Sequence, residues 1–166
     1  LIDGLAAADS DAELTVVGKP VDEHYVSQCR DRVADHGLSE RVTFTGGIDD
    51  ASLAAEFREH HVLAVPSRYE GYGIVYLEGM GFGLPAVASQ AGGATDIVTD
   101  SENGFLVDPG DAAAVADAIM ALAADRERLA TMGQAARRRY ETQPDWTETA
   151  ATVRGLLGSV VAEDSG

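Results

Sequence analysis

Segments rich in β-branched and aliphatic residues alternate with segments of helical periodicity along almost the whole chain. The strand-like segments are residues 13–18, 42–46, 61–67, 85–89 and 104–108. The helical segments are residues 21–37, 49–60, 73–83, 95–99, 111–123, 125–140 and 146–161. Strands that alternate with helices of this length predict a parallel sheet covered on both faces. The predicted fold class is therefore α/β with a doubly wound parallel sheet.

The length and composition fit one folded domain. The chain has 166 residues, of which 45% are hydrophobic and 24% are charged, enough for one core and too few for two. We expect a single domain over residues 1–166, with residues 142–166 as a C-terminal helical segment. No apolar stretch approaches the roughly 20 residues of a transmembrane helix, and no basic-then-apolar leader opens the chain. The sequence therefore predicts a soluble protein.

Cys29 is the only cysteine, so the chain has no internal disulfide and no cysteine pair with metal-ligand spacing. Tyr25 and Val33 lie four residues on either side of Cys29, which puts all three on one face of the expected helix. We expect Cys29 to fill space in the core.

Acidic side chains outnumber basic ones by 28 to 12, which gives a formal net charge of −16, and Lys19 is the only lysine. A field of this sign repels phosphate backbones and anionic membrane surfaces, so nucleic acid is a poor partner. The arginine run at residues 137–139 could be an anion site, but its helical context favours a solvated face.

An acidic, lysine-poor surface is similar to that of proteins adapted to high salt, in which salt screens the repulsion between like charges. On this halophilic interpretation, the midpoint of thermal unfolding should rise as KCl increases towards molar concentration. Circular dichroism melts across a KCl series measure the effect. A midpoint indifferent to KCl would contradict the interpretation.

Five loops follow the expected strands, and in doubly wound folds ligands bind beyond the carboxyl ends of the strands. The loops are residues 18–20, 45–49, 66–73, 89–95 and 108–111. Two of them are rich in glycine and precede a helix, with the sequences EGYG at 70–73 and AGGATD at 91–96. Glycine lets backbone amides approach a ligand, and a helix N-terminus favours an anion. We interpret both loops as phosphate-binding; tight turns without a ligand are the alternative.

Glu70 and Glu78 enclose a run that is otherwise apolar, aromatic or glycine. A buried unpaired carboxylate costs several kcal/mol, so Glu78 needs a partner, water or a ligand. Eight helical residues would separate the two acids by about 12 Å, whereas glycosidase carboxylates lie roughly 5 to 9.5 Å apart. The spacing favours a ligand held at both ends, such as a nucleotide-diphosphate sugar. A partly exposed Glu78 paired with Arg68 is the alternative.

Residues 66–89, PSRYEGYGIVYLEGMGFGLPAVAS, resemble the E-x7-E signature of the retaining GT-B glycosyltransferases called glycosyltransferase family 4, or group 1. Residues 92–111 resemble the stretch that follows this signature, and residues 13–18, 41–49 and 144–146 fall in the family's order. The resemblance implies a Rossmann-like donor-binding domain, the C-terminal half of a GT-B fold. It also implies that the first strand and the N-terminal acceptor domain are absent, so that this chain is an inactive fragment of an enzyme.

The resemblance assigns roles to ten residues. Glu70, the implied catalytic residue, would hold the hydroxyls of the donor sugar, and Glu78 would bind the ribose hydroxyls. The other implied donor-binding residues are Gly18, Ile48, Gly71, Tyr72, Gly73, Ile74, Gly92 and Gly93. The amides of residues 71–74 would face the diphosphate and sugar, the backbone of Ile48 would contact the base, and Gly18 would line the same cleft. Residues 92–93 would close the sugar side.

Some positions depart from the family pattern. A histidine, within His60-His61, stands where an acid is usual before the strand at 61–67, and we interpret it as structural. Asp96 stands where a glutamate is commoner. Gly79 and Gly81 replace alanines, at a cost of up to about 1 kcal/mol each in a helix unless close packing requires glycine.

The implied reaction transfers a sugar from a nucleotide-diphosphate sugar to an acceptor with retention of configuration. The acceptor would be a glycan, a lipid or a small molecule, and the location cytoplasmic or peripheral at the inner membrane face. We expect no cofactor and no metal, because His60 and His61 are adjacent rather than spaced along a helix face.

Other classes are compatible with parts of the sequence. A non-catalytic nucleotide-sugar-binding module that kept the fold is the main alternative. A dinucleotide-dependent oxidoreductase would need G-x-G-x-x-G after the first strand, where this chain has VVGKPVDE. A pyridoxal phosphate enzyme would need a Schiff-base lysine, and Lys19 is the only lysine.

Overall fold

The computed structural model describes residues 1–163, with the backbone alone at residues 158 and 160–163. The helices are α1 (Ile2–Ala7), α2 (Glu23–Asp35), α3 (Asp50–Glu59), α4 (Ile74–Gly81), the 3-10 helix η1 (Gly93–Asp96), α5 (Ala112–Ala124), α6 (Arg126–Glu141) and α7 (Trp146–Glu163). The strands are β1 (Leu14–Val17), β2 (Val42–Gly46), β3 (Leu63–Val65), β4 (Ala86–Ser89) and β5 (Gly104–Val107). Every expected strand and helix is present, and α1 precedes the first of them.

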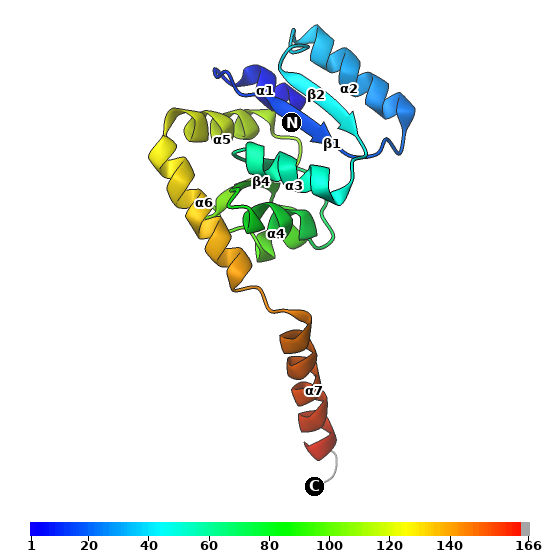
Figure 1. Ribbon diagram of the computed structural model, residues 1–166, viewed down its shortest axis with the longest axis vertical. Helices are drawn as coiled ribbons and strands as arrows, with labels where there is room; N and C mark the ends of the chain where they lie inside the picture. The colour runs from blue at the N-terminus through cyan, green and yellow to red at the C-terminus, as the bar shows by residue number, and fades with distance from the viewer. Residues whose placement is uncertain (164–166) are drawn as a thin grey trace.

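All strand pairs are parallel, as a doubly wound fold requires. The strands form two hydrogen-bonded groups, one of β1 and β2 and one with the order β3-β4-β5 (Figure 1). The central strand β4 is buried along its whole length, whereas β1 and β3 are only partly buried. The predicted α/β class is therefore confirmed, with the parallel strands divided into two groups.

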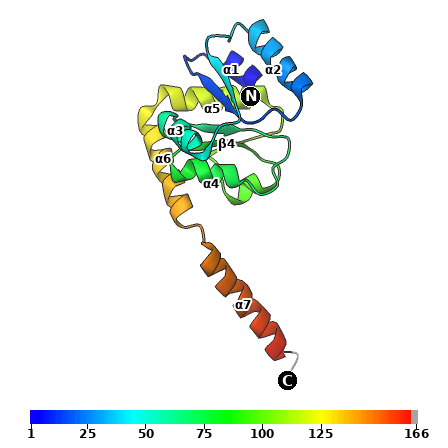
Figure 2. The same cartoon turned by 45° about the vertical axis from the view of Figure 1, so that its right-hand side comes forward.

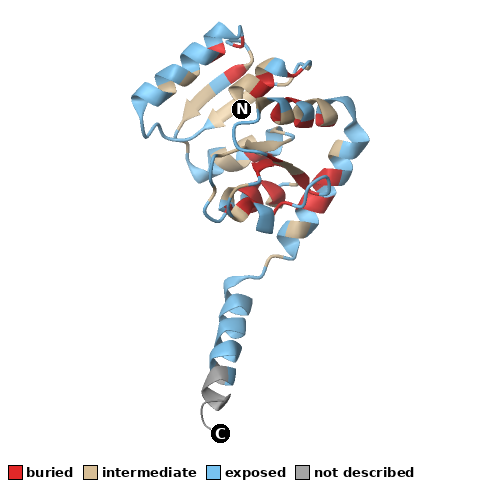
Figure 3. Cartoon of the chain, turned by 180° about the vertical axis from the view of Figure 1, so that it is seen from behind, coloured by how far each residue is buried: buried red, intermediate tan, exposed pale blue. Residues whose placement is uncertain are grey.

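Side-chain alternation along β4 divides the core of the β3-β4-β5 group into two faces. Ala86 and Ala88 pack against α4, η1 and α6, while Val87 packs against β5 and α5 on the other face. Because successive strand residues point to opposite faces, an apolar run with no polar alternation must be covered on both sides. Figure 3 shows the buried residues gathered around these strands.

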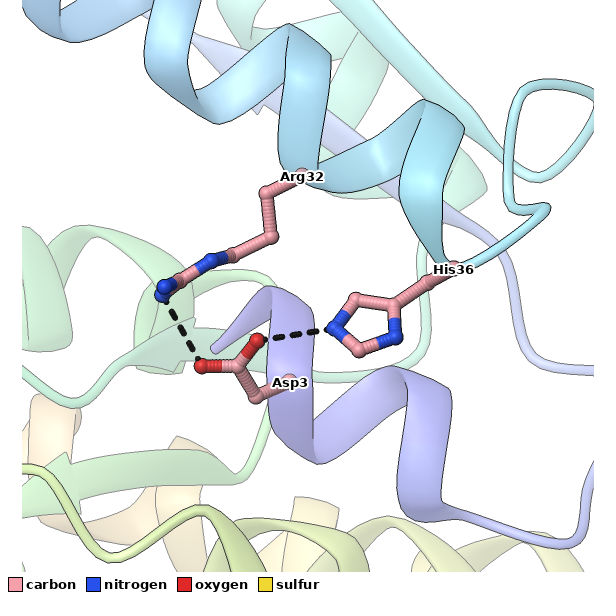
Figure 4. A network of polar contacts seen from close by, with 3 residues as sticks. All are labelled: Asp3, Arg32 and His36. Atoms are coloured by element: carbon pink, nitrogen blue, oxygen red, sulfur yellow. Dashed lines mark hydrogen bonds and ion pairs between the residues drawn. The ribbon is translucent and has the colours of Figure 1, made fainter.

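The first two helices hold the β1–β2 group through a smaller core and one polar cluster. Leu5 and Val33 lie in this core. Asp3 accepts hydrogen bonds from Arg32 Nη1 at 3.0 Å and from His36 Nε2 at 2.9 Å (Figure 4). All three side chains are exposed, so each ion pair contributes at most about 1 kcal/mol. The cluster orients α1 on α2 more than it stabilises the fold.

The expectation for Cys29 is only partly met. Val33 is buried, but Cys29 is half-buried and Tyr25 is 64% exposed. Helical spacing correctly placed the three residues on one face of α2. The first turn of α2 lies beyond the edge of the small core, so that part of the face is exposed to solvent. Cys29 is a free thiol at the margin of this core.

One helix differs from the sequence expectation. The short helix expected at residues 95–99 is η1, which begins at Gly93 and ends at Asp96. It stops early because the buried Asn103 side chain accepts a hydrogen bond from the Thr99 amide at 2.8 Å and donates one to the Ile97 carbonyl at 3.1 Å.

Helix α7 extends away from the rest of the chain (Figures 1 and 2). Its apolar residues Trp146, Leu156 and Leu157 are exposed, with Trp146 at 89%. Of the C-terminal helical segment expected at residues 142–166, residues 146–163 are helical, and residues 164–166 lie outside the described part of the chain. None of the helices within residues 1–163 combines the length and the apolar character that crossing a membrane requires.

Candidate functional site

The two glycine-rich loops of the sequence lie against each other. Both follow carboxyl ends of neighbouring parallel strands, β3 and β4, so the sheet brings them to one edge. The backbone of Glu70 forms a parallel β-bridge with Gly92, and the Gly93 amide donates to the Glu70 carbonyl at 2.9 Å. Residues 70–73 and 92–93 are thus brought together as one unit, which we call the double loop.

Close backbone packing explains both glycines on the β4 side of the double loop. A Cβ atom on Gly92 would collide with the carbonyl oxygen of Glu70, and Gly92 also has a φ of +78°, in the left-handed region. A Cβ on Gly93 would lie 2.8 Å from the Gly71 carbonyl oxygen and from Tyr72 Cα. The resemblance implied that Gly92 and Gly93 close the sugar side of the site. Their close packing against residues 70–72 is a structural role that the sequence did not predict.

Helix α4 begins at the end of the first loop, without a side-chain cap. Its N-cap is Gly73, at a φ of +87°, and a Cβ there would lie 2.7 Å from the ring of Tyr76. Among the described residues, no hydrogen bond is donated by the amides of Gly71, Tyr72, Gly73 or Ile74. Four consecutive amides at a helix N-terminus are therefore available to an anion.

Tyr76 is a buried support beneath this loop. Its side chain is fully buried, and its hydroxyl donates to the carbonyl of Val65 at the end of β3, at 2.8 Å. Burial, and then the negative charge of Glu70, raise the pKa of Tyr76 to about 12. The hydroxyl therefore stays protonated and keeps donating at any ordinary pH, which holds the start of α4 to the end of β3.

The two acids of the E-x7-E pattern have different surroundings. Glu70 lies before α4 and is half-buried, whereas Glu78 lies on α4 and is exposed. Ile74, one helical turn before Glu78, is also exposed, so the two form part of one open face of α4. The salt bridges of the described residues do not include a pair between Glu78 and Arg68, so the alternative pairing is wrong. The carboxylate of Glu78 is therefore exposed to solvent rather than buried.

The other predicted residues lie at the ends of β1 and β2. The amide of Gly18 donates to the carbonyl of Gly46 at 2.9 Å, which brings the loop after β1 to the loop after β2. The stem of Lys19 lies across Gly47, where a side chain would collide with it, and Ile48 follows, half-buried. These residues form a second group, separate in sequence from the double loop, at the carboxyl ends of the other pair of strands.

Asp49, next to Ile48, is a helix cap. Its side chain accepts a hydrogen bond from the Ser52 amide at 2.8 Å. That bond to the backbone of Ser52 lowers the pKa of Asp49 below its ordinary value. Asp49 thereby determines where α3 begins and how the preceding loop leaves β2.

The histidine that departs from the family pattern is structural, as expected. His60 Nδ1 lies 2.7 Å from the Glu56 carbonyl oxygen, and Nε2 lies 2.9 Å from Thr15 Oγ1. His60 therefore ties the end of α3 to β1. The described residues contain no group of three or more histidine, cysteine and acidic side chains arranged to hold a metal ion.

The interpretation of residues 137–139 as a solvated face holds for Arg137 and Arg138, which are exposed, and is wrong for Arg139. Arg137 donates to the Gly81 carbonyl and pairs with Glu141 at 2.8 Å. Arg139 is half-buried and contacts the loop that contains Asp96. Only Arg138 is exposed without a side-chain hydrogen bond to the described residues. Three adjacent positions on a helix point in different directions, so a run of like residues in sequence need not form one surface.

Comparison with known proteins places the chain in a family. Residues 1–139 match the family described as Glycosyl transferases group 1. The phosphatidyl-myo-inositol mannosyltransferase of Mycobacterium leprae is 36% identical over 166 residues, which cover 98% of this chain and 42% of that protein. The GDP-mannose-dependent alpha-(1-6)-phosphatidylinositol monomannoside mannosyltransferase of Mycobacterium tuberculosis is 35% identical over 156 residues, 90% of this chain and 40% of that protein.

The fold of this chain is also similar to that of a solved structure. Anabaena Alr3699/HepE, in complex with UDP-glucose, superimposes with a TM-score of 0.86 at 29% sequence identity, covering 96% of this chain and 44% of that one. The chain therefore spans less than half the length of each of these proteins. Its α/β fold is that of the C-terminal domain of GT-B glycosyltransferases. The chain belongs to the Glycosyl transferases group 1 family.

Proposed function

We propose that this chain is the donor-binding domain of a retaining glycosyltransferase, which transfers a hexose from a nucleotide-diphosphate sugar to an acceptor. The observation that carries the proposal is the row of unengaged amides at the start of α4, set between Glu70 and Glu78. A sugar-nucleotide has a matching sequence of groups: hydroxyls, diphosphate, hydroxyls. The rest of the protein, beyond this chain, would bind the acceptor.

The diphosphate and the sugar joined to it are assigned to the amides of residues 71–74. A helix N-terminus carries a partial positive charge, and amides that no protein group accepts from lose no internal bond when they bind phosphate. The chain as a whole carries 28 acidic and 12 basic side chains, so its general field does not attract an anion. Local amide dipoles are the attraction that this site offers, and they would also stabilise the charge that develops on the leaving diphosphate.

The sugar is assigned to the side of Glu70. This carboxylate is half-buried, and its backbone is held by Gly92 and Gly93 on one side while Tyr76 supports the loop from below. A carboxylate held in this way can accept hydrogen bonds from sugar hydroxyls without first becoming ordered, which lowers the entropic cost of binding. Glu70 thereby orients the donor sugar for transfer. We expect the reaction to proceed without a cofactor or a bound metal.

The ribose and base are assigned to Glu78 and to the loops after β1 and β2, around Gly18 and Ile48. The relatives name two different donors, GDP-mannose for the Mycobacterium tuberculosis protein and UDP-glucose for the Anabaena structure. We propose GDP-mannose as the first donor to test, because the two mycobacterial relatives named above are both mannosyltransferases and share more identity with this chain. Their names also make a lipid-linked inositol the first acceptor to test.

Glu78→Ala should weaken the binding of GDP or UDP to this chain by about 1.5 to 3 kcal/mol, or roughly tenfold to a hundredfold, because it removes a charged hydrogen-bond acceptor for the ribose. Isothermal titration calorimetry measures the loss. Glu59→Ala is the matched control: it removes the same charge from an exposed site at the far end of α3. Equal affinity of wild type and Glu78→Ala would remove Glu78 from the site.

A further inference from the structure

The last turn of α6 and the segment that follows it contact Tyr72 of the double loop and Asp96 at the end of η1. Arg139 Nη2 donates to the carbonyl oxygen of Asp96, the last residue of η1, at 3.3 Å. Gln143 Nε2 donates to the hydroxyl of Tyr72 at 3.4 Å. Arg139 Nη1 in turn donates to Gln143 Oε1 at 2.8 Å, so the two side chains form one connected network.

We propose that Arg139 and Gln143 are positioning residues that brace the sugar side of the donor site. They act through the loop residues Tyr72 and Asp96. The proposal rests on the proposed function above, since it assigns the double loop to a sugar-nucleotide. It adds a specific role for the end of α6: to keep the loop after β3 and the loop after β4 at a constant separation while the sugar binds.

The chemistry of the Arg139 contact favours a positioning role for this side chain. The carbonyl of Asp96 ends a short helix and has no following turn to bond with, so a guanidinium is a suitable partner. A guanidinium is planar and offers several donors in a rigid fork, which lets Arg139 bond Asp96 and Gln143 at once. A lysine could not do both with fixed geometry.

The Gln143 contact restrains an otherwise free side chain. Tyr72 is 57% exposed, and its hydroxyl contact with Gln143 is the hydrogen bond that its side chain makes within residues 1–163. Tyr72 carries one of the unengaged amides. This amide precedes the N-cap of α4 at Gly73, on the Glu70 side of the row, so a restrained ring limits the conformations of the backbone that would face the sugar. Gln143 itself is half-buried and is oriented by Arg139.

The two loops would thus be tied at two points. On one side their backbones pair directly, through Glu70 with Gly92 and Gly93. On the other side the brace joins Tyr72 to Asp96 through two side chains of α6 and its C-terminal end. Glu78, which lies on the open face of α4, takes no part in the brace. Losing the brace should therefore disturb the sugar more than the nucleotide.

The test compares two ligands on the same variants. Isothermal titration calorimetry measures the affinity of the 166-residue chain for GDP and GDP-mannose, and for UDP and UDP-glucose. Arg139→Ala should weaken binding of the nucleotide-sugar about tenfold, the effect of one lost charged contact, and leave binding of the nucleotide diphosphate within about twofold. Arg138→Ala, an exposed neighbour of the same type, should change neither affinity.

A double-mutant cycle and a ligand-free readout complete the test. Gln143→Ala and Tyr72→Phe should each lower the affinity for the nucleotide-sugar. The double variant should have no lower affinity than the single variant that binds less tightly, because both substitutions remove the same contact. Arg139→Lys should restore only part of the affinity. Hydrogen exchange of the free chain should quicken at the amides of residues 71–73 and 94–98 in Arg139→Ala and not in Arg138→Ala.

The outcomes separate the two proposals. If the wild-type chain binds both ligands and Arg139→Ala weakens both affinities equally, the brace is overturned. Additive losses of affinity in Gln143→Ala and Tyr72→Phe would also overturn it. Either result would leave the proposed donor-binding function standing. A wild-type chain that binds none of the four ligands would overturn the proposed function, and with it the role of the brace in donor binding. A selective loss of nucleotide-sugar affinity that Arg138→Ala does not reproduce would support both.

Discussion

Gly92→Ala should lower the free energy of unfolding by about 3 kcal/mol and abolish sugar-nucleotide binding. Two causes add at this position. The φ of +78° is unfavourable for any residue with a Cβ atom, and that atom would also collide with the carbonyl oxygen of Glu70. To relieve the collision, the two loops would have to separate, which breaks the Glu70–Gly93 hydrogen bond and moves the proposed catalytic carboxylate.

Gly110→Ala is the matched control for this prediction. Gly110 has a similar φ of +85°, but an added Cβ would meet nothing within 4 Å. Gly110→Ala should cost only the backbone strain, about 1 kcal/mol. Urea unfolding of both variants measures the difference. Equal losses of stability would mean that the loops are not packed as closely as the geometry requires.

Glu70→Gln in the full-length protein should lower the turnover of sugar transfer at least a hundredfold, in line with the loss of a group that acts on the transition state. The substitution keeps the shape of the side chain and removes its charge, so the double loop should still fold. Binding of the nucleotide diphosphate alone should stay within about twofold, because the phosphates are assigned to amides rather than to this carboxylate.

Initial rates with the donor and acceptor, together with calorimetry of the nucleotide diphosphate, separate the two quantities. Glu59→Gln, at the exposed C-terminal end of α3, controls for the change of charge and should leave turnover unchanged. Undiminished turnover in Glu70→Gln would remove this residue from the mechanism. A parallel loss of nucleotide diphosphate affinity would mean instead that the variant has disturbed the loop.

The sequence predicted the parts of this structure that depend on local pattern. Strands and helices differ enough in hydrophobic period for their alternation to identify the α/β class, and parallel connection then places the following loops at one edge. For the same reason, the start of α4 after EGYG could be anticipated, because buried apolar residues recur at helical spacing after Gly73. The ten site residues accordingly lie in the expected loops or on α4.

The sequence did not predict features that depend on contacts between distant residues. Glycines such as Gly92 look alike whether they face a ligand or another backbone, and only the packing shows that Gly92 abuts Glu70. The exposure of Glu78 follows from which face of α4 packs on the core. The contact of Arg139 with Asp96 spans 43 positions, so nothing in the run of three arginines distinguishes it. The hydrogen bond from the buried Tyr76 hydroxyl to Val65 could not be predicted either, because it also joins residues of different elements.

The most direct test of the central claim is to follow the glycine amides of this chain by NMR while GDP and UDP are added. The claim is that the amides at the start of α4 bind the diphosphate, so the Gly71 and Gly73 signals should shift most with one of the two nucleotides. Gly37, in the turn after α2, should stay in place. Saturating shifts at Gly71 and Gly73 would support the donor site. Shifts confined to other glycines, or none with either nucleotide, would contradict it.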